Sequence, residues 1–331
     1  MKLTKTQIGD IVHNVLSHSF DDAGRLHLHR FTESQMKTYG AEDEGWALRA
    51  NASASAVFDM VTDSEFITVK LDLYPGSSHH WGSFDLYVDG VFTDSRHLGD
   101  LGIKLVAFPL PVGEHRITLY FPWSLQTVVN EVLVSDGATI QPVERKCKIL
   151  AFGDSITQGY ITKFTSLSYV NHVARQLDAE IVNQGIGGYY FNETTIDRSI
   201  TAYAPDVITV AYGTNDYSRY DDREAFIRGS GAYIRKLASL FPDAKIVGIL
   251  PFYRNDQNHQ VRKLYRDYSL DEARQILRGF YGECENGYVV AETGIGHIPE
   301  MFAADYLHPN ELGFTVLAQG LVPALQEIIN R

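Results

Sequence analysis

The chain has 331 residues, more than one hydrophobic core usually serves, so two domains are the expectation. Hydrophobic residues make up 44% and charged residues 21%, as in an ordinary globular protein. The formal net charge of −12 argues against nucleic acid and anionic membrane partners, because both are bound by basic faces, and it leaves neutral substrates open.

The cysteines and the N-terminal stretch indicate which cellular compartment the protein occupies. Cys147 and Cys284 are too few for a disulfide framework and form no Cys-x-x-Cys pair, so two reduced thiols are expected. The N-terminus shows no apolar run of the secretory kind before His13 and Asn14, and no stretch approaches the ~20 apolar residues that span a bilayer. We expect a cytoplasmic protein; the oligomeric state is open.

Residues 1–145 have the pattern of β structure. Alternating or β-branched and aromatic runs, separated by turn residues, predict short strands. The predicted strands are 56–60, 66–74, 84–88 with 91–92, 115–121 and 128–134. Asp89-Gly90 is a strong hairpin signal between two of them. This half is therefore predicted to be a β-sandwich that resembles a jelly roll.

The pattern changes near Arg145 to strands that alternate with helices. Strands are predicted at 148–152, 180–183, 206–211, 245–250 and 288–291, and helices at 168–177, 224–240, 271–280 and 312–329. Such alternation is typical of a parallel sheet with helices on both faces, which binds ligands at the carboxyl ends of its strands. The predicted domains are residues 1–145 and 146–331.

Ser155 follows the first parallel strand in the stretch Gly153-Asp154-Ser155. Glycine permits a tight turn there, but Gly-Asp-Ser alone is also common in turns and helix caps. The stretch is not a Gly-x-Ser-x-Gly elbow, because Thr157 occupies the last position.

Three further motifs lie at later strand ends or before the last helix. Residues 183–188, Asn-Gln-Gly-Ile-Gly-Gly, could aim a backbone N–H at a ligand, or be a plain turn. Asn215, in Gly-Thr-Asn-Asp, could donate its amide or form an Asx-turn. Asp305 lies three residues before His308 and could orient its imidazole, or both could belong to a surface turn.

These four motifs, in this order, resemble the SGNH (GDSL-type) hydrolase family across the second half of the chain. The resemblance implies a flavodoxin-like three-layer α/β/α domain and a carboxylic ester hydrolase. It assigns Ser155 as nucleophile, Asp305 and His308 as the rest of a catalytic triad, and Gly188, Asn215 and the Ser155 N–H as oxyanion donors. Gly187 is the alternative to Gly188. This mechanism requires no cofactor and no metal.

The order of the two domains is similar to that of carbohydrate esterase family 2 enzymes, which remove acetyl groups from sugars. Further candidates for substrate contact are Asp154, Tyr190, Tyr253 and Arg254. Packing, a backbone hydrogen bond for Asp154 and a surface ion pair for Arg254 are their alternatives. Asp216 and Glu292 are expected to serve loop backbone or helix caps.

Histidines and tryptophans of the first half carry weaker signals. His27, His29, His79 and His80 lack a matching set of acids or cysteines for a metal. Trp46, Trp81 and Trp123 could form a sugar platform, although core or interface packing is favoured.

The predicted function is hydrolysis of a short acyl ester, acetyl foremost, on a small molecule or glycan. The alternatives are an acyl hydrolase of the lysophospholipase or thioesterase type, and a carbohydrate-binding protein in which the sandwich dominates.

Overall fold

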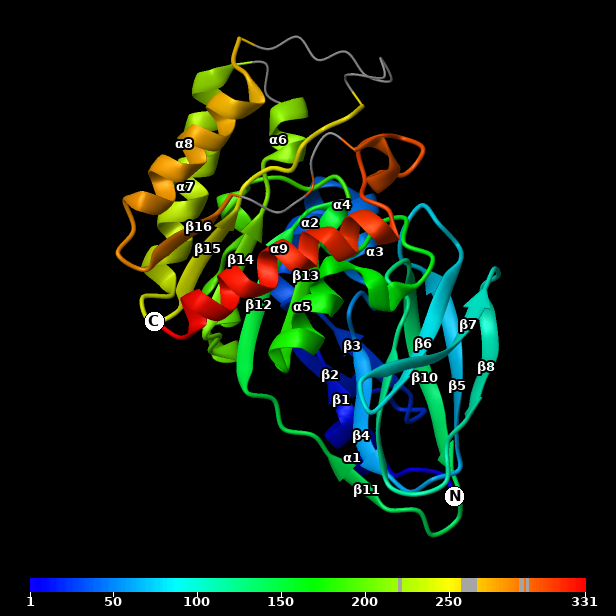
Figure 1. The fold of residues 1–331 in the computed structure, drawn as a ribbon. Helices are drawn as coiled ribbons and strands as arrows, with labels where there is room; N and C mark the ends of the chain where they lie inside the picture. Colours follow the sequence, from blue (N-terminus) through cyan, green and yellow to red (C-terminus); the bar gives the residue numbers. More distant parts are fainter. Residues whose placement is uncertain (220–221, 257–266, 292–294, 296–297) are drawn as a thin grey trace.

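The computed structural model describes residues 1–219, 222–256, 267–291, 295 and 298–331. An N-terminal part with two antiparallel sheets lies beside a C-terminal parallel sheet covered by helices (Figure 1). This confirms the predicted fold class, a sandwich-like part followed by a three-layer α/β/α domain.

The N-terminal part contains three helices and eleven strands among its described residues. The helices are α1 (Lys5–Ile11), α2 (Glu33–Glu42) and α3 (Glu44–Ala50). The strands are β1 (Val12–His13), β2 (Ser17–Phe20), β3 (Leu26–His29), β4 (Val57–Thr62), β5 (Phe66–Pro75), β6 (Gly82–Val88), β7 (Val91–Leu98), β8 (Gly102–Pro109), β9 (His115–Tyr120), β10 (Leu125–Val134) and β11 (Ile140–Pro142). One sheet has the order β1-β4-β9-β6-β7, with β11 beside β4, and the other has the order β2-β3-β10-β5-β8.

Strand β5 shows why these residues form a sandwich. Ile67, Val69, Leu71 and Leu73 alternate along it and are each at most 1% exposed, so one face of the strand enters the core between the sheets. The hairpin between β6 and β7 turns at Asp89-Gly90, where both residues have positive φ. That conformation is the one a two-residue turn of this type requires.

Several N-terminal elements were not predicted. Helices α1 and α2 both begin with a capping box, formed by Thr4 with Gln7 and by Thr32 with Gln35. This sequence signal is independent of the spacing of apolar residues from which the elements were predicted. Strand β8 was missed because it carries apolar residues on both faces, with Ile103 and Leu105 exposed and Val106 and Phe108 buried, which blurs the two-residue period.

The C-terminal part is built on five parallel strands. They are β12 (Cys147–Gly153), β13 (Ala179–Gly185), β14 (Val207–Ala211), β15 (Lys245–Ile249) and β16 (Gly287–Val290), in the order β13-β12-β14-β15-β16. The helices are α4 (Ser155–Gln158), α5 (Tyr169–Leu177), α6 (Thr214–Arg219), α7 (Arg223–Leu240), α8 (Leu270–Gly282) and α9 (Glu311–Ile329). Short 3-10 turns are η1 (Thr165–Leu167), η2 (Glu193–Thr195), η3 (Arg198–Tyr203) and η4 (Pro299–Met301).

Helices cover both faces of this parallel sheet. Apolar side chains of α5 and α9 pack on one face, and those of α7 and α8 pack on the other (Figure 1). Because all five strands are parallel, their carboxyl ends meet at one edge, where the loops after β12, β13 and β14 lie together.

Helix α9 is the one described helix long and apolar enough to cross a membrane, judged by length and composition alone. From the sequence no such stretch was expected, and α9 is the exception by these two criteria. Phe314, Leu317 and Leu321 are fully buried against the parallel sheet, which is how a core helix meets the same criterion.

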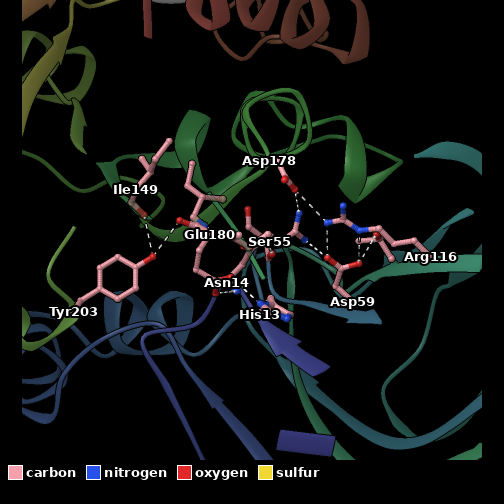
Figure 2. Close-up of polar contacts among 12 residues, drawn as sticks. His13, Asn14, Ser55, Asp59, Arg116, Ile149, Asp178, Glu180 and Tyr203 are labelled. Atoms are coloured by element: carbon pink, nitrogen blue, oxygen red, sulfur yellow. Dashed lines mark hydrogen bonds and ion pairs between the residues drawn. The ribbon is translucent and has the colours of Figure 1, made fainter. Parts of the chain in front are cut away.

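The two parts of the chain meet through a polar network (Figure 2). The His13 ring and the Glu180 carboxylate lie 2.8 Å apart, and Asn14 accepts a hydrogen bond from the Ile181 N–H while donating to the Ser55 carbonyl. These bonds attach the chain at β1 to the start of β13.

A second group of charges in Figure 2 surrounds Asp59, whose side chain is fully buried. Arg116 and Arg145 both pair with Asp59, and both also contact Asp178 at 3.3 Å. A buried carboxylate needs such partners, so this group makes β4 and the C-terminal part depend on each other. The last sandwich strand ends at Pro142 and β12 begins at Cys147; the division at residue 145 stays a prediction.

Candidate active site

Ser155 is the first residue of α4, which follows strand β12. Gly153 must be glycine, because a Cβ there would lie 1.9 Å from the Thr157 hydroxyl oxygen. Asp154 caps α4 by accepting the Ile156 N–H at 2.9 Å. Gly159 ends the helix with φ of +97°. The short strand–turn–helix thus presents the Ser155 side chain at the carboxyl edge of the sheet.

A chain of short contacts joins Ser155, His308 and Asp305. Ser155 Oγ lies 2.7 Å from His308 Nε2, and His308 Nδ1 lies 2.6 Å from Asp305 Oδ2. The other oxygen of Asp305 accepts the N–H groups of Leu307 and His308, each at 3.0 Å. Burial alone would raise the pKa of Asp305, but the His308 ring and these N–H donors lower it to about 2, so the carboxylate is ionised and holds the imidazole.

The aromatic ring of Tyr160 lies against the His308 ring, with centroids 4.5 Å apart. Tyr160 also packs against Trp123 at 5.4 Å and His79 at 5.0 Å, both from the N-terminal part. The imidazole is therefore held between a carboxylate at one nitrogen and an aromatic group at its face.

Of the glycines after β13, Gly188 has an N–H that no described residue engages. The Gly187 N–H donates to Gln158 Oε1 at 2.8 Å and the Ile186 N–H donates to the Gly153 carbonyl at 3.0 Å. Gly188 has φ of +83°, a conformation that favours glycine. The geometry thus leaves Gly188, rather than Gly187, able to donate to a ligand.

Asn215 lies on α6, after β14. Its side-chain nitrogen donates one hydrogen bond, to the Tyr189 carbonyl at 2.9 Å, and makes no other within the described residues, so its second hydrogen is available. Asp216 joins the same loops, because its two oxygens accept the N–H groups of Phe191 and Gly213 at 3.0 Å each. Its expected role as a loop-holding residue agrees with these contacts.

The motif residues line a cavity of about 240 Å³ together with residues of the N-terminal part. Its lining residues are Arg49, Ser77, Ser78, Ser155, Gln158, Tyr160, Gly187, Gly188, Asn215, Leu307 and His308. Sequence reasoning missed Arg49, Ser77 and Ser78, because no motif marks them; only the packing of the two parts brings them to this edge.

The four other residues that were predicted to contact substrate are not among the residues that line this cavity. Asp154 is buried beneath α4, and Arg254 is 4% exposed, with its guanidinium on Asp256 and on the Thr214 carbonyl. Tyr190 lies under the guanidinium of Arg219 at 4.1 Å, and Tyr253 contacts Phe302. Their roles as substrate contacts stay predictions. Glu292 lies outside the described residues.

The tryptophans of the first half pack against other aromatic rings. Trp46 packs on Tyr189 at 4.9 Å, and Trp81 and Trp123 pack on each other at 5.9 Å. In the described part of the chain, no group of three His, Cys, Asp or Glu side chains is arranged to hold a metal ion.

Comparisons with solved structures find the same two-part architecture. A salicylyl-acyltransferase, SsfX3, from a tetracycline biosynthetic pathway matches with a TM-score of 0.81 and 18% identity, over 97% of this chain and 96% of that one. A putative GDSL-like lipase from Bacteroides ovatus ATCC 8483 matches with a TM-score of 0.72 and 18% identity, over 100% and 98%. A family two carbohydrate esterase from Cellvibrio japonicus matches with a TM-score of 0.63 and 21% identity, over 96% and 95%.

The likeness to these solved structures, at 18–21% identity, shows the fold alone, whereas the match to a family model identifies the family. No curated protein matches the sequence closely enough to count. The sequence model of the GDSL-like lipase/acylhydrolase family matches residues 151–316, which include all four motifs and half of the chain. The chain therefore belongs to the GDSL-like lipase/acylhydrolase family.

Proposed function

We propose that this protein is a serine ester hydrolase that removes short acyl groups, acetyl foremost, from a carbohydrate or another small alcohol. The observation that carries the proposal is the contact chain from Ser155 through His308 to Asp305, which opens onto a cavity at the carboxyl edge of the sheet. A serine hydroxyl is a weak nucleophile until an adjacent base takes its proton, and this arrangement supplies that base.

The proposed reaction proceeds through an acyl-enzyme. His308 Nε2 takes the Ser155 proton while Oγ attacks the ester carbonyl, and Asp305 stabilises the imidazolium. The N–H groups of Ser155 and Gly188 and the amide of Asn215 stabilise the negative oxygen. The tetrahedral intermediate collapses, and His308 returns the proton to the leaving alcohol. Water, deprotonated by His308, then attacks the acyl-enzyme and releases the acid and free Ser155. These steps use no cofactor.

The size and lining of the cavity favour a short acyl group. Its volume of about 240 Å³ lies below the range usual for pockets of drug-sized ligands. Leu307 is its one aliphatic side chain among the described lining residues, whereas a long acyl chain needs an apolar channel. The lysophospholipase alternative is therefore the less favoured one.

Aromatic side chains beside the cavity support a sugar as the alcohol. Trp81, His79 and Tyr160 form a continuous series of ring contacts of 5.5 and 5.0 Å that reaches the His308 ring. Such rings offer flat apolar faces to a sugar. The fold is also that of a carbohydrate esterase from Cellvibrio japonicus, which adds weight without deciding the substrate.

The N-terminal part supports an enzyme more than a separate carbohydrate-binding protein. Arg49, Ser77 and Ser78 line the same cavity as Ser155, so the sandwich-like part contributes to the site itself. Glycan binding by residues 1–145 without any ester hydrolysis by the whole chain would favour the alternative instead.

The test compares Ser155→Ala with Ser34→Ala, which removes an exposed hydroxyl from α2. We expect the first variant to lose hydrolysis of p-nitrophenyl acetate while its circular dichroism spectrum stays that of the wild type, and the second to keep its activity. Undiminished turnover by Ser155→Ala would overturn the mechanism.

The substrate class is tested with an acyl series from acetate to octanoate beside acetylated sugars. We expect acetate and the acetylated sugars to be preferred; a preference for octanoate would favour the lysophospholipase or thioesterase alternative. Because a salicylyl-acyltransferase shares the fold, adding an alcohol acceptor such as glycerol will show whether the acyl group passes to water or to the alcohol.

A further inference from the structure

We propose that Arg49 makes the site selective for esters that carry a carboxylate near the ester bond, on either the acyl group or the alcohol. This inference rests on the proposed ester hydrolysis and concerns the class of ester. It begins from an asymmetry in the cavity: among its lining residues, Arg49 is the one permanently charged side chain, and no lysine, aspartate or glutamate faces it there.

Arg49, on α3, packs against the loop that carries the Gly188 N–H. A Cβ placed on Gly187 would lie 3.2 Å from Arg49 Cδ and 3.5 Å from its Nε. Trp46, three residues earlier on α3, lies beside Gly188 in the same way, with its Nε1 3.7 Å from the position of a Cβ. Residues three apart share a helix face, so one face of α3 covers the two glycines and extends Arg49 over them.

The backbone of Arg49 is fixed relative to the sheet. Its carbonyl accepts a hydrogen bond of 2.9 Å from the buried guanidinium of Arg30, which also donates to the Gly185 carbonyl at 3.2 Å. Arg49 thus shares an anchor with the end of β13, and its side chain starts from a fixed point near the reacting centre.

No ion pair joins Arg49 to a carboxylate in the part of the chain that the structure describes. Asp43 is the neighbouring acid: a Cβ placed on Gly45 would lie 2.8 Å from Asp43 Oδ1 and 3.3 Å from Arg49 Nη1. The exposed Asp43 carboxylate instead caps α3 by accepting the Gly45 N–H at 2.6 Å. The guanidinium thus lies at the cavity without an ion pair among the described residues, in a chain whose net charge is −12. Its planar fork matches a carboxylate with two parallel hydrogen bonds.

If Arg49 acted on the transition state instead, a different result would be expected. A guanidinium whose Nε lies beside Gly187 could stabilise the negative oxygen that every ester develops, in which case all esters would depend on it equally. A carboxylate receptor would matter only for esters that bear the carboxylate. The comparison of charged and neutral esters separates the two roles.

The experiment uses two matched pairs of esters with the full-length protein. In the first pair the acyl group differs: the p-nitrophenyl half-ester of succinate and its methyl ester. In the second pair the alcohol differs: p-acetoxybenzoate and its methyl ester. We expect wild-type kcat/KM to favour the anionic member of one pair, and the pair that responds identifies the side of the ester that carries the charge.

Arg49→Gln should lower the ratio of anionic to neutral kcat/KM in that pair by roughly 10- to 100-fold, the loss of a charge-assisted bond to a carboxylate. Arg49→Lys should keep part of the ratio, because it retains the charge and loses the fork. Arg278→Gln is the control: it removes the same charge from an exposed side chain on α8 that does not line the cavity, and should leave the ratio unchanged.

Two results would overturn the inference alone. Wild-type protein that hydrolyses all four esters without preferring a carboxylate would show that Arg49 selects nothing. An equal loss by Arg49→Gln on both members of a pair would assign Arg49 to the shared transition state. Failure of the wild type to hydrolyse any of the four esters would instead overturn the proposed function, and this inference with it.

Discussion

The guanidinium of Arg30, from the N-terminal part, donates a hydrogen bond of 3.2 Å to the carbonyl of Gly185 at the end of β13, the strand that precedes Gly187 and Gly188. Arg30 is 2% exposed and also donates to the carbonyls of Ala50 and Ala52. Burial lowers its pKa to about 9, and its partners here are backbone carbonyls. One buried side chain thus connects α3 and β13, the two elements that border the cavity from opposite parts of the chain.

Replacing Arg30 with lysine should weaken both the fold and the site. A lysine cannot reach the same set of carbonyls, so buried acceptors lose their donors, and the free energy of unfolding should fall by about 2–4 kcal/mol. Thermal unfolding and kcat/KM measured at a permissive temperature should both decline. Arg278→Lys, at an exposed position on α8, is the control. An unchanged unfolding midpoint for Arg30→Lys would contradict this account.

His308→Ala should reduce kcat by more than Asp305→Asn does. The histidine moves the proton in every step, whereas the aspartate orients it and stabilises its charged form. A difference of roughly 10- to 100-fold between the variants is expected, by analogy with other serine triads. Steady-state kinetics on p-nitrophenyl acetate give the comparison, with circular dichroism to check the fold. Equal losses would show that the two residues act as one unit.

Asn215→Ala should lower kcat with little change in KM. The amide is expected to bind the negative oxygen of the transition state more strongly than the ground-state carbonyl, and losing one such donor typically costs about 3–4 kcal/mol in activation free energy, a factor of ~10²–10³. The variant also loses the bond to Tyr189, so its thermal midpoint is measured beside the kinetics. A rise in KM alone would point to substrate binding instead.

The Asp154 carboxyl should make the free energy of unfolding depend on pH between about pH 4 and pH 6. Burial raises its pKa to about 6, so between about pH 4 and pH 6 the folded state binds more protons than the unfolded state. The free energy of unfolding therefore falls as pH rises through this window. Asp154→Asn keeps an oxygen for the Ile156 N–H and removes the titration, so it should gain stability relative to wild type between pH 4 and pH 7.

Denaturant unfolding at a series of pH values measures that difference. Asp22→Asn, at an exposed position, should show a nearly constant difference from wild type. A constant difference for Asp154→Asn as well would mean that Asp154 does not titrate in this range.

Local patterns predicted much of this fold correctly. The alternation along β5 and the Asp89-Gly90 hairpin depend on neighbours a few residues apart, and so does the strand that ends at Gly153. The order of strands and helices was enough to place the four motifs at one edge, because parallel strands end together. In the structure Ser155, His308 and Asp305 lie in contact there, and their catalytic roles are the proposal to be tested.

Other features depend on which distant surfaces meet. Arg254 was predicted to contact substrate or to form a surface ion pair, and its guanidinium is buried on Asp256. Arg49, which no motif marks, lies at the cavity beside Gly187. Sequence by itself determined the family, the alternation of strands and helices in the second half, and the candidate nucleophile, because these follow from periodicity and motif spacing. Only the tertiary structure decided that the N-terminal part borders the site, because that results from long-range packing around residues such as Arg30, which no local pattern encodes.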